Sequence, residues 1–271
     1  MPLSTDETGP QWRRRTARED VLSWFGWATG LAVVGGCFFL ISEKTIWEFV
    51  WSAPREAADL GARMVPPDWS YSSQLWRPLW DTFNIATLGT GLALVISVPV
   101  AFCAARNTTP STAIARPLAL FVIASSRSIN SLIWALLLVV IVGPGVFAGV
   151  LAIALRSIGF CGKLLYEAIE EIDVPPVEAV TATGASSGQV LTYGVVPQVM
   201  TAFAGISVFR WDINIRESTI LGLVGAGGIG LQLSASINNL DWSRVAVILL
   251  AILGTVIVSE WLSAKVRGAL S

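Results

Sequence analysis

Apolar residues along this chain gather into long runs that are separated by short polar stretches. A helix needs roughly 20 apolar residues to cross a bilayer, whereas the helices of a soluble domain keep a polar face. The pattern therefore predicts an all-α integral membrane protein with about six transmembrane helices. The run at 146–161 is short and rich in glycine, so five or seven spans are the alternatives. The six runs cover residues 21–42, 82–105, 117–142, 146–161, 195–213 and 245–266.

The composition agrees with a place in the membrane. Charged residues make up 14% of the 271 residues and hydrophobic residues 54%, whereas soluble domains carry about 25% charged residues. A mean hydropathy of +0.65 and few charges argue against disorder. A nucleic-acid partner would need a basic patch, and none stands out in the sequence, so we expect no such partner. The chain has no histidine, and Cys37, Cys103 and Cys161 lie apart, in or beside apolar runs. We therefore expect no metal site, no cofactor and no enzyme activity in this chain.

The segments outside the core predict how the chain enters the membrane. Residues 1–20 form a polar tail, expected in the cytoplasm. The run at 21–42 is longer than the apolar core of a cleaved signal peptide, so we expect it to stay as the first span. Residues 43–81 hold four prolines and five tryptophans. Because tryptophan favours the membrane–water interface, this segment is predicted to be extracytoplasmic and to lie partly on the membrane.

The distribution of basic residues predicts that both termini are cytoplasmic. Ten Lys and Arg fall on the predicted inner side and six on the outer side, and cytoplasmic loops are enriched in these residues. The ten are Arg13, Arg14, Arg15, Arg18, Arg106, Arg116, Arg156, Lys163, Lys265 and Arg267.

Residues 166–193 predict a short helix and a bend on the cytoplasmic side. Asp173 followed by two prolines is typical of a helix start. Glu178 is then expected in the first turn, where the helix dipole favours a carboxylate. Gly184 would interrupt the helix after two or three turns. A short helix, a bend and a second short helix would form a compact knob that a partner protein could grip.

Glu178, Ala179, Gly184 and Pro197 resemble, in identity and spacing, the EAA loop of ABC-importer permeases. The resemblance implies a type I importer-permease fold over residues 82–267, in which the first three of these residues couple the chain to an ATPase. The sequence departs from that loop at the apolar positions Val180, Gly194 and Val196.

The same resemblance implies partners and a location. A dimer of ATP-binding cassette ATPase subunits would bind ATP and magnesium, and an extracytoplasmic binding protein would deliver the substrate. The site of action would be the cytoplasmic (inner) membrane. We expect a second copy of this chain, because one coupling loop per chain suits a two-fold ATPase. The alternatives are a loop with no partner, and a secondary transporter or channel without an ATPase.

Within the glycine-rich turn 222–230, residues 225–230 match the G-x-G-x-x-G fingerprint of dinucleotide sites. That fingerprint requires a preceding strand and a following helix of a βαβ unit, but here membrane spans flank it. We interpret the run as a backbone bend near the outer end of a transport route, where irregular backbone is tolerated if protein or water covers it. The glycines of this predicted bend or gate are Gly225, Gly227, Gly228 and Gly230.

Three segments, 127–139, 209–216 and 216–230, resemble the phosphonate permeases among ABC importers more closely than other subfamilies. The resemblance implies import of phosphonate, or of phosphate or phosphite. A methionine-type permease is the alternative within the same class. The sequence does not rank the three oxyanions.

Arg127 falls within the third predicted span, and Arg210 and Asp212 fall within or at the end of the fifth. Each would cost at least about 2.5 kcal/mol if it faced lipid. One interpretation is that Arg127, Arg210 and Arg216 line a polar route and attract an anionic substrate, because the guanidinium fork binds oxyanions through two hydrogen bonds. The other interpretation is that Arg210 has a structural role and pairs with Asp212 or Glu217. Asp212 and Arg210 point to different faces of the helix, which argues against a pair between these two.

Overall fold

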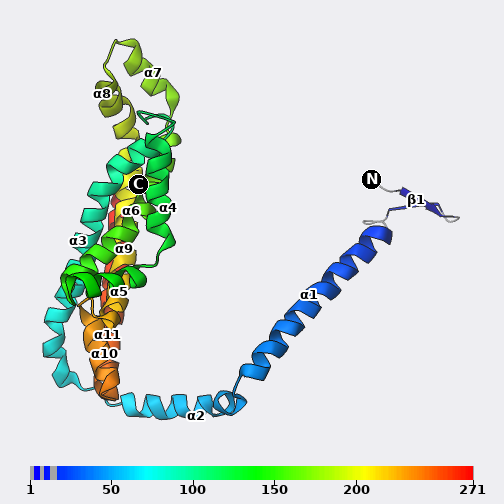
Figure 1. Cartoon of the computed structure of the whole chain (residues 1–271), viewed down its shortest axis with the longest axis vertical. Helices are drawn as coiled ribbons and strands as arrows, with labels where there is room; N and C mark the ends of the chain where they lie inside the picture. The colour runs from blue at the N-terminus through cyan, green and yellow to red at the C-terminus, as the bar shows by residue number, and fades with distance from the viewer. Residues whose placement is uncertain (1–2, 7–8, 13–16, 271) are drawn as a thin grey trace. The chain divides into compact units, whose positions relative to one another are not determined.

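The computed structural model of this protein describes residues 3–6, 9–12 and 17–270. It divides into two compact units, Met1–Gly61 and Ala62–Ser271, which are described separately below. Figure 1 shows the helices and strands of each unit.

The first unit holds a strand pair and a long apolar helix. β1 (Leu3–Asp6) and β2 (Gly9–Trp12) pair antiparallel, with Leu3 opposite Trp12. α1 (Ala17–Lys44) extends the predicted first span at both ends. α2 (Trp47–Met64) begins in this unit and carries the first two tryptophans of the segment predicted to lie partly on the membrane. Arg13, Arg14 and Arg15 of the predicted inner rim lie outside the described residues.

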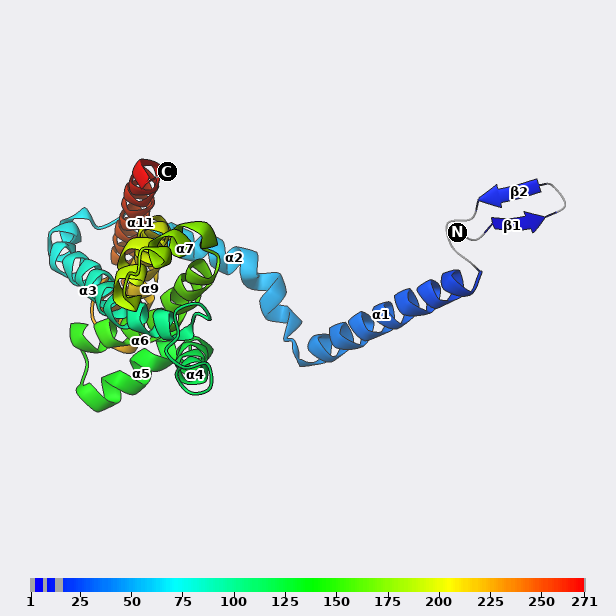
Figure 2. The same ribbon diagram turned by 90° about the horizontal axis from the view of Figure 1, so that it is seen from above.

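The second unit is built around one central helix, α6 (Val146–Glu170). α3 (Ser72–Ala104), α4 (Ala115–Ser128), α5 (Ser131–Val142) and α9 (Val196–Leu221) all pack against it. Figure 2 shows α6 among these four helices. The most apolar stretch of α6 is 67% buried, against 39% for that of α3. α6 therefore forms the core on which the other helices are placed.

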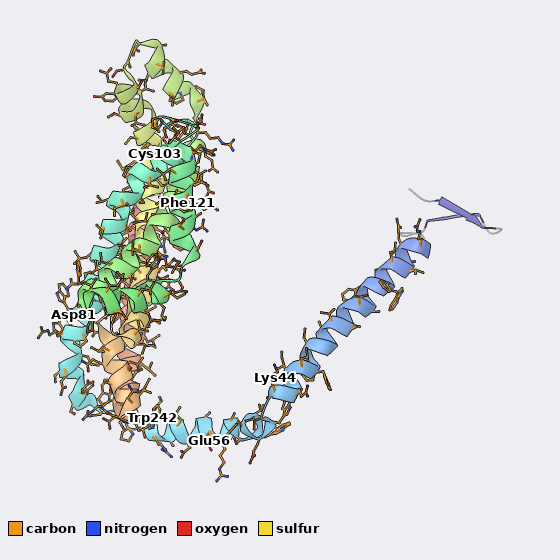
Figure 3. The ribbon with its side chains drawn as sticks, viewed as in Figure 1. Lys44, Glu56, Asp81, Cys103, Phe121 and Trp242 are labelled. Carbon is orange, nitrogen blue, oxygen red and sulfur yellow. The ribbon has the colours of Figure 1, made fainter. Side chains whose placement is uncertain are left out.

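The remaining helices cover one end and one side of unit 2. A short 3-10 helix, η1 (Trp69–Tyr71), leads into α3, and α10 (Ile229–Asn238) packs on α11 (Trp242–Leu270). Figure 3 places Trp242 at the end of unit 2 opposite to Cys103 of α3.

An ion pair fixes the start of α3 to the start of α11. Asp68 lies 3.5 Å from Arg244, and the Asp68 N–H donates to the Ser243 carbonyl at 3.2 Å. Tyr71 packs under the Arg244 guanidinium at 5.2 Å. Hydrogen bonds from Ser70, with Arg244 adding to them, hold the pKa of the Asp68 carboxyl below its usual value.

The span prediction is confirmed in outline. Five helices are long and apolar enough to cross a membrane, and the α4–α5 pair makes a sixth if it is one broken span. The single helix expected at 117–142 is wrong: the chain bends by 89° between α4 and α5. Ile129 is extended there, and the Asn130 side chain accepts a hydrogen bond from the Leu132 N–H, which caps α5.

Two predicted helix ends are also wrong, in the same direction. α6 continues to Glu170 instead of stopping at residue 161, and α9 continues to Leu221 instead of residue 213. Both extensions contain charged residues, which hydropathy alone assigns to loops. The charges are tolerated because ion pairs hold them: Lys163 lies 3.4 Å from Glu167 on the next turn.

Close contact between α3 and α6 depends on Gly89. A β-carbon at this position would lie 2.6 Å from Cγ2 of Ile153 and 3.1 Å from the Val150 carbonyl oxygen. Small residues of this kind let membrane helices approach closely. Gly91, two residues further along, has nothing within 4 Å of the same position.

Gly89→Val is expected to lower the free energy of unfolding by about 1–3 kcal/mol, because the core has no room for the added methyl groups. Thermal unfolding in detergent measures the effect. Gly91→Val is the matched control and should stay within about 0.5 kcal/mol of the natural protein. Equal stability of the two variants would contradict this account of the α3–α6 contact.

Candidate coupling and transport sites

The predicted coupling helix is present as α7 (Val174–Ala182), and its start is held by α9. The Asp173 N–H donates to Oε1 of Gln198 at 3.0 Å, and Nε2 of Gln198 donates to the Asp173 carbonyl at 3.3 Å. Asp173 occupies the N-cap position, but its side chain makes no capping hydrogen bond. The reciprocal pair with Gln198 therefore fixes α7 to the first turn of α9.

The spacing between Asp173 and Glu178 predicted that Glu178 lies in the first turn of α7. This prediction is wrong, since the first turn of α7 contains no acidic residue. Glu178 and Ala179 are both exposed. A partner protein would therefore find this face of the helix uncovered. The prediction of an exposed knob does not depend on an interaction between Glu178 and the helix dipole.

Gly184 provides the predicted bend. Its φ of +79° lies in the left-handed region that favours glycine, and its N–H donates to the Thr181 carbonyl at 3.0 Å. Ser186 and Gln189 then form a capping box that starts α8 (Ser187–Val190). A π-helical turn, η2 (Leu191–Val195), leads from α8 into α9.

The two short helices enclose a shallow pocket at the end of unit 2 opposite to α10 (Figure 1). The ring of Tyr193 in this pocket is largely exposed. Its surface is apolar and small-residue rich, which suits a protein partner better than a small charged ligand. The lining residues are Ala179, Val180, Thr183, Gly184, Ala185, Gln189 and Tyr193.

The glycine run forms a bend, as predicted, between η3 (Gly222–Val224) and α10. Gly225, Gly227 and Gly228 have φ values of +90°, +81° and +76°. At Gly230 a β-carbon would lie 2.0 Å from the Thr219 carbonyl oxygen, so only glycine fits. Backbone geometry therefore accounts for these glycines, and a nucleotide site is not needed to explain them.

The same bend packs against two other elements of unit 2. The Gly145 N–H donates to the Gly225 carbonyl at 3.0 Å, and the Ile229 N–H donates to Oγ1 of Thr82 at 2.8 Å. These bonds satisfy backbone groups that irregular chain would otherwise leave unpaired within a membrane. The bend is therefore fixed to the loop before α6 and to α3.

Arg210 is buried in the interior of unit 2, with 2% of its side chain exposed. Its Nε donates to Oγ of Ser157 at 2.9 Å, and its Cζ lies 5.0 Å from the centre of the Phe160 ring. Ser157 also meets Asn214, whose Nδ2 donates to Oγ1 of Thr90 at 2.7 Å. This network satisfies the polar groups between α3, α6 and α9.

Glu217 is shared between two arginines. Its Oε2 lies 3.4 Å from Nη2 of Arg210, and its Oε1 lies 3.5 Å from Nε of Arg156. The side chains of Glu217 and Arg156 are 19% and 31% exposed. Of the two partners considered for Arg210, Glu217 is therefore the one the structure shows, and Arg156 joins the group from α6.

Arg127 lies against the same turn of α6. The Gly159 N–H donates to Oγ of Ser126 at 2.8 Å, and a β-carbon on Gly159 would lie 2.7 Å from Cγ of Arg127. Oγ of Ser126 also lies 3.3 Å from the Arg156 carbonyl oxygen. Arg127 is exposed, and among the described residues no hydrogen bond or ion pair holds its guanidinium. We call Arg156, Arg210 and Glu217, which two ion pairs join, the arginine cluster.

Arg216 does not belong to this cluster. It lies 2.6 Å from Asp212 and 3.1 Å from Glu260 of α11. Asp212 in turn accepts a hydrogen bond from Ser259 of α11 at 2.8 Å. Arg216 thus lies on the α11 face of α9, away from the face that carries Arg210.

Arg156 is the residue that sequence reasoning missed. It was assigned to the inner rim of basic residues, but it lies ten residues inside α6, among buried apolar side chains. Its position within the apolar run 146–161 was the available signal. Lys163 was assigned to the same rim and also lies within α6.

The comparisons with known proteins agree with this geometry. Residues 97–267 match the family described as the binding-protein-dependent transport system inner membrane component. The chain therefore belongs to this family of ABC-importer permeases. It is a transport subunit of the inner membrane and not an enzyme, since ATP is hydrolysed by a separate subunit in this family.

Curated relatives extend the match beyond the family segment. The phosphite transport system permease protein PtxC of Stutzerimonas stutzeri is 43% identical over 210 residues, which are 78% of this chain and 76% of that protein. The phosphate-import permease protein PhnE of Mycolicibacterium smegmatis is 42% identical over 205 residues, which are 76% of this chain and 38% of that protein. The phosphonate-type resemblance is therefore confirmed at the level of relatives.

A solved structure supports the fold. The inward-facing MetNI methionine ABC transporter has a chain that superposes with a TM-score of 0.65 at 20% identity, over 75% of this chain and 99% of that one. The type I importer-permease fold is thereby confirmed. Family membership also argues against the secondary transporter or channel considered from the sequence.

Gly184→Leu is expected to lower ATP-driven uptake about tenfold while the protein stays in the membrane. A residue with a β-carbon pays roughly 1–2 kcal/mol in the left-handed conformation, so the bend after α7 would shift. Uptake and ATP hydrolysis by the reconstituted complex measure the effect. Gly188→Leu is the control, because Gly188 has open space around it and an ordinary φ. Full uptake in Gly184→Leu would show that this bend does not matter for coupling.

Proposed function

We propose that this chain forms the transmembrane route of an ATP-driven importer for a phosphorus oxyanion: phosphonate, phosphite or phosphate. The observation that carries the proposal is the excess of arginine around one turn of α6. The names of the similar permeases, which include phosphite and phosphate carriers, support the same substrate class. A methionine substrate has less support, because the similar methionine transporter shares only the fold.

Arg127 is the residue that we place in contact with the anion. An exposed guanidinium at membrane depth is costly in lipid, so this face of α4 borders water or a partner. Water could solvate this charge. An oxyanion matches it better, because two of its oxygens can accept hydrogen bonds from two parallel N–H groups of the guanidinium. Arg210 is buried and does not contact the anion in this proposal; it acts through its ion pair with Glu217.

Arg216 has a different role in this proposal. Its two carboxylate partners join α9 to α11, so it stabilises the helix pair at the side of the route. This assignment replaces the direct substrate contact expected from the sequence.

The glycine bend belongs to the outer half of the route. α9 has 26 residues, and a helix rises about 1.5 Å per residue, so about 39 Å separate its two ends. With α7 and α8 at the cytoplasmic ATPase, the bend lies towards the binding protein. Gly225, Gly227, Gly228 and Gly230 would then form a gate on that side.

The working assembly in this proposal is two copies of this chain, two ATPase subunits that bind ATP and magnesium, and one extracytoplasmic binding protein. Each copy offers one coupling knob, which suits a two-fold ATPase. Both termini are cytoplasmic. Pairing with a second, different permease chain is the alternative, and mass measurement of the purified complex separates the two.

Arg127→Gln is expected to lower uptake at limiting substrate at least tenfold, because the anion loses a charged contact worth about 1.5 kcal/mol or more. Uptake of radiolabelled phosphite and methylphosphonate by proteoliposomes with the ATPase and binding protein measures it. Arg127→Lys should restore part of the loss.

Arg106→Gln provides the control, since Arg106 is an exposed arginine whose side chain is 75% accessible at the end of α3. Copurification of the ATPase shows that each variant still assembles. Undiminished uptake in an assembled Arg127→Gln complex would remove Arg127 from the route and contradict the proposed anion contact.

A further inference from the structure

The turn between α10 and α11 holds a leucine in an unfavourable backbone conformation. Leu240 has a φ of +59°, and among the described residues it is the only residue other than glycine with a positive φ. In this left-handed region a β-carbon crowds the following carbonyl oxygen, so glycine and asparagine are the residues usually found there. The backbone of this turn therefore favours a residue other than leucine.

The hydrogen bonds of the turn explain its conformation but not its leucine. The Asp241 N–H donates to the Ser236 carbonyl at 3.0 Å, and the Leu240 N–H donates to the Ile237 carbonyl at 3.0 Å. This pair of bonds closes α10 with a Schellman motif, in which the left-handed position is usually glycine. The reason for a leucine must therefore lie in its side chain.

The side chain of Leu240 is not buried in the fold, because 68% of it is exposed. Its neighbours are polar: Asn238 and Asn239 are exposed, and the side chain of Asp241 is 45% exposed. The apolar run of α11 begins only at residue 245. These neighbours argue against a place among lipid chains, where such polar groups would lack partners.

The turn that presents Leu240 is fixed to α11 and to the start of α3. Arg244 lies 3.3 Å from Asp241 and 3.5 Å from Asp68, and the Val245 N–H donates to the Asp241 carbonyl at 3.0 Å. A turn that is already ordered loses little entropy when a partner binds it. Strained backbone that its surroundings hold in place is typical of binding and switch regions.

α10 joins this turn to the glycine bend. It begins at Ile229, which Thr82 binds, and ends at Asn238, two residues before Leu240. Ten helical residues span about 15 Å, so the turn lies about that far from the proposed gate. Figure 3 labels Trp242, which follows this turn, at the end of unit 2 opposite to Cys103. In the proposed function this is the extracytoplasmic end.

We propose that Leu240 is a docking residue that inserts into an apolar recess of the extracytoplasmic binding protein. This inference rests on the proposed function and adds to it a surface that the binding protein recognises. The family of this chain is described as binding-protein-dependent, which gives the soluble partner at this end. An apolar contact surrounded by a polar rim is the usual arrangement of a protein interface, and the Asp241–Arg244 ion pair provides part of such a rim.

Photocrosslinking identifies what contacts the turn. Benzoylphenylalanine is placed at position 240 of the permease–ATPase complex in lipid nanodiscs, and the complex is irradiated during ATP turnover with binding protein and phosphite. The expected product joins the permease to the binding protein. A product with a second permease copy, or with lipid alone, would overturn the inference. The same label at Ile114, which is 74% exposed at the opposite end of unit 2, is the control and should not capture the binding protein.

Leu240→Gly and Leu240→Asn separate docking from folding, because both residues suit left-handed backbone better than leucine does. Both variants should unfold at no lower a temperature than the natural chain. Both should need at least about tenfold more binding protein for half-maximal stimulation of ATP hydrolysis, while hydrolysis without binding protein stays unchanged. Leu240→Met keeps an apolar side chain and should retain most of the stimulation. Ile114→Asn is the control and should need no more binding protein than the natural chain.

An unchanged requirement for binding protein in Leu240→Gly and Leu240→Asn would overturn the inference. A lower unfolding temperature in both variants would also overturn it, because the leucine would then serve the fold. The proposed function would survive either result if Arg127→Gln still loses uptake. Full uptake in an assembled Arg127→Gln complex would instead contradict the proposed anion contact, whatever Leu240 does.

Discussion

The ion pairs that Glu217 makes with Arg156 and Arg210 constrain how α6 and α9 can be arranged. Arg210 has 2% of its side chain exposed, and a buried charge that loses its partner costs several kcal/mol. α9 therefore cannot slide along α6 without a new partner for this guanidinium. Because α9 is also joined to α7 through Gln198 and Asp173, we infer that a displacement of the coupling helix passes to the same arginines.

Apolar run length was sufficient to predict the order of the spans and their approximate number, because the residues of a membrane helix face either lipid or the protein interior along its whole length. It was not sufficient for the helix ends. Lys163 and Glu217 lie within helices because ion pairs between turns and between helices offset their charge. Hydropathy scores each residue alone and carries no information on such pairs. The break near Asn130 was missed for a related reason, since capping depends on one side chain in a strongly apolar stretch.

The candidate site was predicted in part. The bend at Gly184 was predicted from local signals, because backbone geometry determines such a bend. Glu178 and Ala179 were singled out by their resemblance to the EAA loop. Arg127 and Arg210 were singled out because charge in an apolar run is unusual, but their meeting at α6 required the tertiary structure. Arg156 was counted with the basic residues of the inner side, and Glu217 was one of two alternative partners for Arg210. Contacts between residues about 60 positions apart leave no periodic signal in a single sequence.

The central claim is that Arg127 contacts the transported anion within the membrane. The most direct test is a structure of the full complex, with ATPase and binding protein, trapped during turnover with phosphite or methylphosphonate. We expect density for the anion against the guanidinium group of Arg127. Density elsewhere in the route, with Arg127 packed against lipid or protein, would contradict it.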